Sequence, residues 1–179
     1  YTAKEAGMAF ERNVLKSKYP VLTVFFEKMR TGNGSMEKYN SKSILAKTIA
    51  QSNGIKDILV SLRDEDFDKD TNSVLKRIDI NFAKTEKGGA WSDLGASVGR
   101  MAARLKVIKH GDYYDVKLLG FDRSNYEYKE DASDIKDKWI RWANNFFYDL
   151  QQQGLITPFS FEVTSNFYFN KSNGKVYTK

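Results

Sequence analysis

Residues 159–169 read FSFEVTSNFYF, and their side chains largely alternate between apolar and polar. The apolar members are Phe159, Phe161, Val163, Phe167 and Phe169, and the polar members are Ser160, Glu162, Thr164 and Asn166. Because successive side chains of a strand point to opposite faces, this pattern predicts a β-strand with one buried face. Asn173-Gly174 then predicts a turn into a short final strand at residues 176–177.

Further strands are predicted upstream. Residues 73–82 form a β-like stretch, and residues 101–108 alternate between apolar and polar side chains. Residues 109–112 (KHGD) carry the glycine of a short hairpin loop, so the chain is expected to return as a strand over residues 113–121. His110, the single histidine, is therefore predicted at the exposed hairpin tip, without a catalytic partner.

Helices are predicted in the first part of the chain. Apolar residues recur at helical spacing in residues 3–16, 21–29 and 55–62, and Ser41 is expected to cap a helix that runs to Gln51. The β-branched residues of the second segment keep a strand possible there.

A long helix is expected over residues 134–153, with Asp134 as its cap and Gly154 at its end. Its stripe of large side chains predicts packing into the core. The stripe consists of Trp139, Trp142, Ala143, Phe146 and Leu150.

The order of these elements predicts an α+β fold in one domain of residues 1–179. Residues 1–62 supply N-terminal helices that pack on an antiparallel sheet, and residues 73–179 supply that sheet with the aromatic helix inserted before the last strands. The acidic segment 64–71 lacks the central glycine and closing glutamate of a calcium loop, so we interpret it as a solvated connection.

Composition excludes several classes of site. The chain has 179 residues, no cysteine and one histidine, which excludes disulfides, thiolate chemistry and zinc sites built on several histidines. No apolar run is long enough to span a membrane. The net charge of +6 favours nucleic acid, anionic lipid or pyrophosphate partners without choosing among them. Because the chain begins at Tyr1 and no signal-type apolar segment follows, we expect it to be an excised piece of a longer polypeptide or a mature product.

The densest polar cluster is residues 120–131, which read GFDRSNYEYKED. Its carboxylates offer the oxygen ligands that Mg²⁺ prefers, and such a metal activates an attacking water. Arg123 or Lys129 could pair with a phosphate, the guanidinium with the better bidentate geometry. The cluster predicts a phosphate-handling site, and the alternative is an ordinary charged turn in solvent.

From Thr31 onward the chain resembles the catalytic domain of colicin M-type bacteriocins, toxins that degrade lipid II. The parallels, in order, are the apolar helix 25–29 ending at Gly32-Asn33-Gly34, the short helix 55–58, a strand opening at Leu94-Gly95, the sequence Tyr126-Glu127-Tyr128, and a phenylalanine-rich strand closing at Gly174-Lys175. The resemblance implies a strongly curved sheet that forms an open half-barrel.

The family signature is Asp-x-Tyr-Asp, then five residues, then His-Arg. Tyr126 stands at the tyrosine, Glu127 at the second aspartate and Ser124 at the first, with Asp122 two residues earlier as a substitute. The His-Arg pair is missing, because residues 133–134 are Ser-Asp. A second frame, residues 112–115 (DYYD) followed by Asp122-Arg123, mimics the signature by spacing but places it on the hairpin itself.

The resemblance implies a Mg²⁺-dependent hydrolase that cleaves the lipid II phosphoester. Asp122 and Glu127 would hold the metal or the water, Tyr126 would orient the phosphate, and Arg123 would neutralise developing charge. The missing histidine leaves three possibilities open. A metal-bound hydroxide with Glu127 could still cut the precursor, the scaffold could carry a different toxic activity, or the chain could bind the precursor uncut.

Within the cluster of residues 120–131, Lys129 and Ser124 are predicted to bind the substrate. The resemblance further implies action in the periplasm of target bacteria and a cognate immunity protein, with lipid II or another pyrophosphate-linked lipid as partner and no stable nucleic-acid partner.

Two other classes of function stay open. A nuclease toxin acting on RNA or DNA in the cytoplasm is favoured by basic residues near aromatic ones, namely Arg104, Lys106, Tyr113 and Tyr114. A non-enzymatic, membrane-perturbing toxin could use the apolar run 21–26 or the aromatic helix.

Overall fold

The computed structural model describes residues 2, 5, 9, 18–124 and 138–179. These residues form six α-helices, two short 3₁₀ helices and six strands, so the predicted α+β class is confirmed. In chain order the elements are α3 (Pro20–Thr31), β1 (Glu37–Tyr39), α4 (Ile44–Ala50), α5 (Asn53–Ser61), η2 (Asp64–Asp66), β2 (Ser73–Asn81), α6 (Phe82–Thr85), η3 (Gly89–Trp91), α7 (Asp93–Ser97), β3 (Arg100–His110), β4 (Tyr113–Ser124), α8 (Lys138–Gln152), β5 (Phe159–Asn170) and β6 (Val176–Thr178). The predicted helix over residues 3–16 lies almost entirely outside the described residues.

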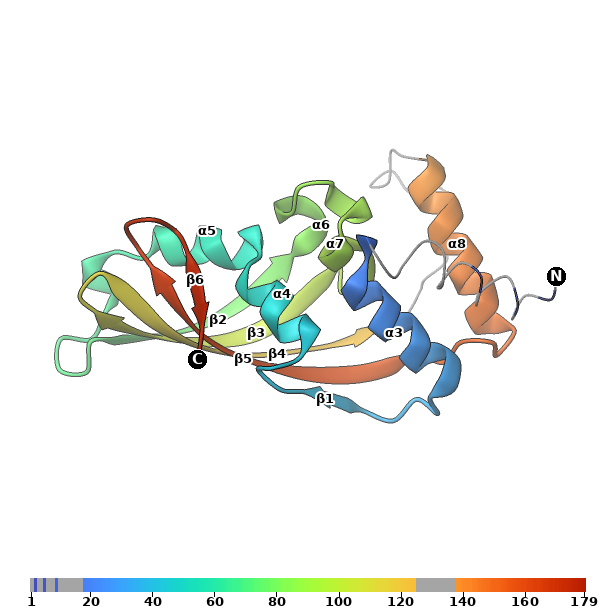
Figure 1. The fold of residues 1–179 in the computed structure, drawn as a ribbon, viewed down its shortest axis with the longest axis horizontal. Helices are drawn as coiled ribbons and strands as arrows, with labels where there is room; N and C mark the ends of the chain where they lie inside the picture. Colours follow the sequence, from blue (N-terminus) through green and yellow to red (C-terminus); the bar gives the residue numbers. More distant parts are fainter. Residues whose placement is uncertain (1, 3–4, 6–8, 10–17, 125–137) are drawn as a thin grey trace.

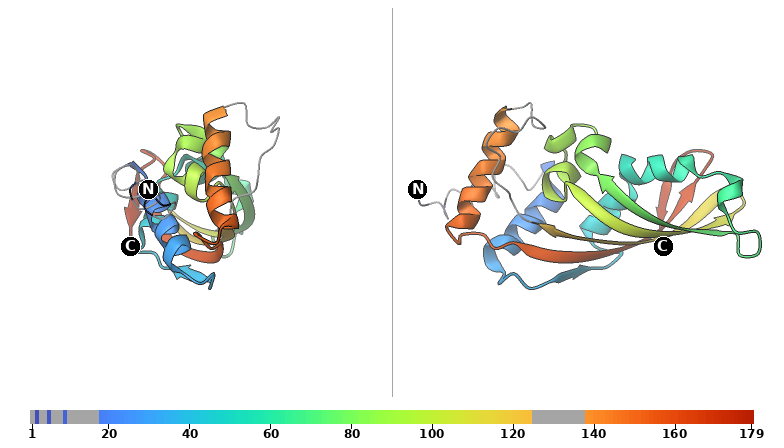
Figure 2. Two further views of the ribbon diagram at one scale, coloured as in Figure 1. Left: turned by 90° about the vertical axis from the view of Figure 1, so that its right-hand side faces the viewer. Right: turned by 180° about the vertical axis from the view of Figure 1, so that it is seen from behind.

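The strands form one open sheet in the order β1-β5-β4-β3-β2, and β6 pairs with β5 as well. All pairs are antiparallel except the parallel pair of β1 with β5. Figures 1 and 2 show helices α3 to α7 on one side of the sheet, while no described helix covers the other side. We call these two sides the covered face and the open face.

The covered face is built on β5, as its sequence predicts. Phe159, Phe161, Val163, Phe167 and Phe169 are buried on this face. The ring of Phe25 in α3 lies 5.3 Å from that of Phe159 and 5.0 Å from that of Phe161, between ring centroids. Each such buried side chain contributes about 1.5–3 kcal/mol through removal of apolar surface from water.

Helix α3 contains the apolar run that the sequence left undecided between helix and strand. Pro20 occupies its first turn, where the missing N–H costs no hydrogen bond. Residues 21, 22, 25, 26 and 29 are buried, so this run belongs to the core. None of the helices among the described residues combines the length and apolar character that a membrane span needs.

Two carboxylates from the segment between β2 and β3 cap helices elsewhere in the chain. Asp93 accepts hydrogen bonds of 2.9 Å from the backbone N–H groups of residues 21 and 22, at the start of α3. Glu86 accepts from those of residues 53 and 54, at the start of α5, at 2.9 and 3.0 Å. Leu94, expected to open a strand, lies in α7 instead, because Ser92 caps a short helix there.

The predicted cap of α4 is wrong by two residues. Ser43 is the cap, and its hydroxyl accepts from the N–H of Ala46 at 3.1 Å. The hydroxyl of Ser41 instead donates to the carbonyl of Thr164 and accepts from the N–H of Asn166, at 3.3 and 3.1 Å. Ser41 therefore bonds β5 between the residues that pair with β1 and the residues that pair with β6.

Helix α8 stands at one end of the sheet (Figure 1) and is the described part of the predicted helix 134–153. Phe147 and Leu150 are buried, and the Phe147 ring lies 5.5 Å from that of Phe26. The predicted burial of Trp142 is wrong, since this side chain is 64% exposed and stacks on Phe146. Figure 1 shows the first turns of α8 extending away from the sheet.

Candidate functional site

The predicted polar cluster begins at the end of β4. Asp122 is partly buried and lies opposite Phe161 of β5, so strand alternation places it on the covered face. The backbones of Arg123 and Ser124 continue β4 and pair with residues 160 and 159.

The other predicted site residues, Tyr126, Glu127 and Lys129, lie outside the described residues, as does the pair at 133–134. Within the described ranges, no group of three or more His, Asp or Glu side chains could hold a metal ion. The Mg²⁺ site at Asp122 and Glu127 therefore stays a prediction.

The residues of the second frame, 112–115, do not come together at one site. Tyr113 is exposed on the open face, whereas Tyr114 is buried on the covered face between Phe67 and Phe169. Asp115 forms an ion pair with Lys179. The sheet itself thus separates the two tyrosines of this frame.

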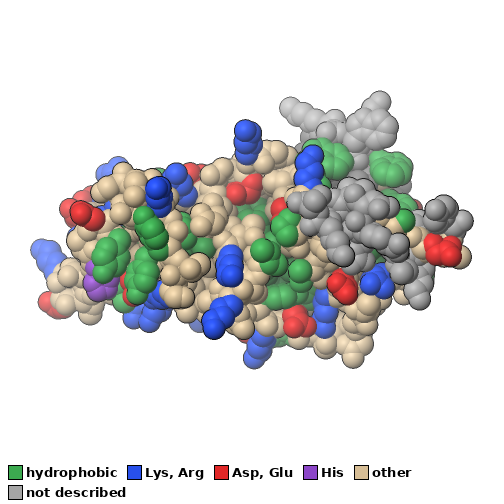
Figure 3. All heavy atoms as spheres, viewed as in Figure 1, with side chains coloured by type: hydrophobic (Ala, Val, Ile, Leu, Met, Phe, Trp, Pro, Cys, Tyr) green, Lys and Arg blue, Asp and Glu red, His purple; other side chains and the backbone are tan. Residues whose placement is uncertain are grey.

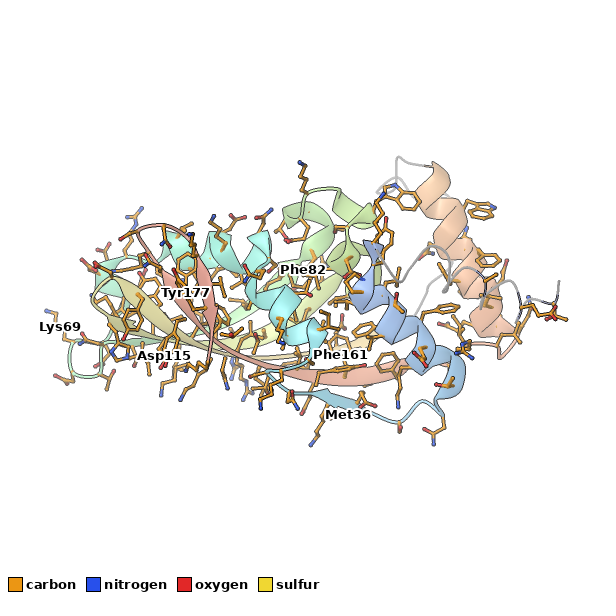
Figure 4. The ribbon with its side chains drawn as sticks, in the orientation of Figure 1. Met36, Lys69, Phe82, Asp115, Phe161 and Tyr177 are labelled. Carbon is orange, nitrogen blue, oxygen red and sulfur yellow. The ribbon has the colours of Figure 1, made fainter. Side chains whose placement is uncertain are left out.

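The open face carries a group of cations on the neighbouring strands β2, β3 and β4. The register places Arg77 of β2 directly opposite Arg104 of β3, and Lys106 of β3 directly opposite Lys117 of β4. All four side chains are exposed. We call these four residues the cation quartet. Figure 4 shows nitrogen-tipped side chains projecting from the sheet on the side away from the helices.

The quartet contains two cross-strand pairs of like charge. Such directly opposed pairs destabilise a sheet. Elsewhere on the open face carboxylates are matched with cations, as in Asp79 with Arg100 at 3.8 Å and Asp115 with Lys179. No ion pair between the quartet and a carboxylate is found among the described residues. The arrangement is therefore suited to an anion from outside the chain.

Apolar side chains border the quartet on the same face. Leu75, which is 75% exposed, lies beside Lys106, and Leu119 lies beside Arg104. Phe121 follows along β4 and is also exposed. The quartet, the two leucines, Thr164 and Asn166 line an open hollow of about 680 Å³. Its chemistry is that of a surface for an amphiphilic anion.

The sequence singled out Arg104 and Lys106 but missed Arg77 and Lys117. The missing information is the register, because only strand pairing shows that these four residues are neighbours. The alternation of apolar and polar residues along each strand could have shown that these side chains face solvent. All four cations occupy exposed positions of their strands.

Comparisons with protein-family models, with curated proteins and with solved structures find no match for this chain. The resemblance to colicin M-type bacteriocins therefore stays a prediction from the sequence.

Proposed function

We propose that this chain is an antibacterial toxin module that captures the lipid-linked peptidoglycan precursor, lipid II, in the periplasm of a target cell. The observation that carries the proposal is the cation quartet with exposed apolar side chains beside it on one open face. Lipid II joins a pyrophosphate to a long polyprenyl chain, so its recognition needs both kinds of contact.

The dimensions of the quartet suit a pyrophosphate. Opposed residues on neighbouring strands lie about 5 Å apart, and the two rows are about 7 Å apart along the strands. Each row supplies two cations, so each phosphate group can be contacted by two positive side chains. The two guanidinium groups add bidentate hydrogen bonding that an ammonium cannot make.

The apolar neighbours suit the lipid. Leu119 and Phe121 continue along β4 away from Lys117, and both are exposed. Burial of such side chains against a polyprenyl chain contributes about 25 cal/mol per Å² of apolar surface removed from water. Capture of the precursor would stop cell-wall synthesis without any bond being cut.

Hydrolysis of the precursor is a second candidate, favoured by the partly exposed Asp122 at the end of β4. Asp122 and Glu127 have the oxygen donors that Mg²⁺ prefers, and the ion would polarise a phosphoryl oxygen. Tyr126, Arg123, Ser124 and Lys129 keep the roles predicted from the sequence. Because Asp122 lies on the covered face, the reacting phosphate must reach the end of β4 rather than the quartet.

We also propose the finer architecture and the biological context that the resemblance implies. It includes a sheet curved like an open half-barrel with the aromatic helix at its end, a larger secreted polypeptide, and a cognate immunity protein.

A vesicle-binding experiment tests capture. Phosphatidylcholine vesicles with and without lipid II are compared for the wild-type chain and for Arg104→Glu/Lys117→Glu. We expect lipid II to increase wild-type binding at least about tenfold, and the double variant to lose that gain. The matched control is Lys84→Glu/Lys87→Glu, which makes the same change in charge at exposed positions near α6.

Three outcomes would decide against capture. Equal binding to both vesicles overturns it, and so does an equal loss in the control variant. Quartet-dependent binding of single-stranded RNA, without binding of lipid II, favours the nuclease alternative over capture.

For the hydrolytic candidate, release of polyprenol in the presence of Mg²⁺ should disappear in Glu127→Ala.

A further inference from the structure

A group of aromatic side chains lies on the same open face, at the hairpin end of the sheet. Tyr113, Tyr168, Asn170 and Tyr177 line an open hollow of about 430 Å³, which we call the tyrosine hollow. Tyr113 and Tyr177 are 44% and 48% exposed. Figure 3 shows the single histidine beside hydrophobic side chains at this end of the molecule.

The rings of the hollow form a fixed corner. Tyr113 and Tyr168 stand at 87° to each other, with centroids 5.6 Å apart. His110 stacks on Tyr113 at 5.6 Å, and the ammonium of Lys179 lies 5.1 Å above the ring of Tyr168. Tyr113 and Tyr168 are thus each supported by a neighbour, so the corner that they form is present before a ligand arrives.

Asn170 supplies an oriented polar group at this corner. Its side-chain oxygen accepts hydrogen bonds from the N–H groups of Ser172 and Asn173, at 2.8 and 3.2 Å. These bonds fix the amide and leave its NH₂ group as the donor available to a ligand. Aromatic walls with a few placed polar groups are typical of small-ligand sites.

The perpendicular rings favour one class of ligand. A planar nucleobase stacks best between parallel rings, which this corner does not offer. A pyranose ring has an apolar C–H face that can lie on one phenol ring and hydroxyl groups around its rim that can bond the amide and the phenol hydroxyls. The geometry points to a sugar ring in the tyrosine hollow.

We infer that the tyrosine hollow binds the disaccharide of lipid II while the cation quartet holds its pyrophosphate, an inference that rests on the proposed function. Lys117 and Tyr113 lie on the same face of β4, four residues apart, which is about 13 Å along a strand. That separation is about the length of a disaccharide. The Asp115–Lys179 pair between them is internally neutralised.

The order of side chains along β4 follows the order of groups in the ligand. Phe121 and Leu119 are apolar, Lys117 is cationic, and Tyr113 is aromatic. Lipid II has the corresponding sequence of polyprenyl chain, pyrophosphate and sugar. A single linear ligand can therefore satisfy all three regions at once.

The test compares two lipids in phosphatidylcholine vesicles, lipid II and undecaprenyl pyrophosphate, which lacks the sugar. We expect the wild-type chain to bind lipid II about tenfold more tightly. Tyr113→Ala/Tyr177→Ala should abolish this preference and leave binding of undecaprenyl pyrophosphate unchanged. Trp91→Ala removes an aromatic side chain of the same exposure away from the hollow and should keep the preference.

The outcomes separate the two proposals. Equal binding of both lipids by the wild-type chain, still lost in Arg104→Glu/Lys117→Glu, overturns the sugar site and leaves precursor capture standing. A preference that survives in the double tyrosine variant also overturns the sugar site. Failure to bind either lipid overturns both proposals.

Discussion

The two faces of β4 and β5 differ in what their side chains do, although the residues alternate along the same strands. On the covered face, buried phenylalanines pack against α3 and α4. On the open face, the sheet places like charges opposite each other and exposes leucine and phenylalanine beside them. The covered face therefore stabilises the fold. The open face contains like-charge pairs that lower stability, and these pairs suit the binding of an anion.

The largest expected difference between the faces comes from truncation of one apolar side chain on each face. Phe161→Ala should lower the free energy of unfolding by about 3–5 kcal/mol, because the ring is fully buried and its removal leaves a cavity. Leu119→Ala on the open face should change it by less than about 0.5 kcal/mol. Urea denaturation of both variants measures this, and similar losses would contradict the assignment of the faces.

Gly120 tests how closely the covered face is packed. A Cβ atom at this position would lie 2.6 Å from the sulfur of Met101 and 3.0 Å from a methyl group of Val163. We therefore expect Gly120→Val to destabilise the chain by about 1–3 kcal/mol through overpacking. The control is Ala102→Val on the open face of β3, which a β-branched residue suits. A thermal denaturation in which Gly120→Val is neutral would show a looser core.

Asp93 tests whether the covering helices depend on their remote cap. Asp93→Asn should cost about 1–2 kcal/mol, because the amide places an NH₂ donor where one of the two acceptor oxygens faced a backbone N–H at the start of α3. Burial raises the pKa of Asp93 above its usual value, although the two N–H donors act to lower it.

The sign of the pH dependence follows from that shift. Above the ordinary pKa of about 4, the unfolded chain has lost a proton that the folded chain still holds. The free energy of unfolding contributed by this group should therefore fall as the pH rises through the raised pKa of Asp93. Urea denaturation at a series of pH values above about pH 4 should show this slope in the wild type and lack it in Asp93→Asn. An identical slope in both would exclude Asp93 as its source.

The smallest predicted effect has the opposite sign. Lys106→Glu replaces a like-charge pair with an attractive pair opposite Lys117, so it should raise stability by about 0.2–1 kcal/mol. The same variant should weaken binding to lipid II vesicles. Lys84→Glu, on α6, makes the same change of charge outside the open face and should affect binding little. A variant that gains stability and keeps full binding would remove Lys106 from the proposed site.

The strands could be predicted because period-two alternation is local. The 159–169 stretch, the 113–121 strand and the exposed position of His110 all agree with the structure. β1 was missed, since three residues paired in parallel with β5 leave no periodic signal. Trp142 was assigned to the core because helical spacing defines a stripe without showing where the covering layer ends.

The candidate site was less predictable, for a physical reason. Arg77 and Lys117 are separated by 40 positions in the sequence, and only the register of β2, β3 and β4 brings them to one surface. Local composition instead drew attention to residues 120–131, where charged residues are consecutive. Of that cluster Asp122 is described with its side chain, and it lies on the covered face.

The hydroxyl of Ser41 has a consequence for association between molecules. It bonds the carbonyl of Thr164 and the N–H of Asn166 where neither β1 nor β6 pairs with β5. This edge of β5 is thus covered along its length by β1, then by the Ser41 side chain, and then by β6. An invading strand from another copy would find these backbone groups already satisfied, which guards the most phenylalanine-rich strand of the molecule against edge-to-edge aggregation.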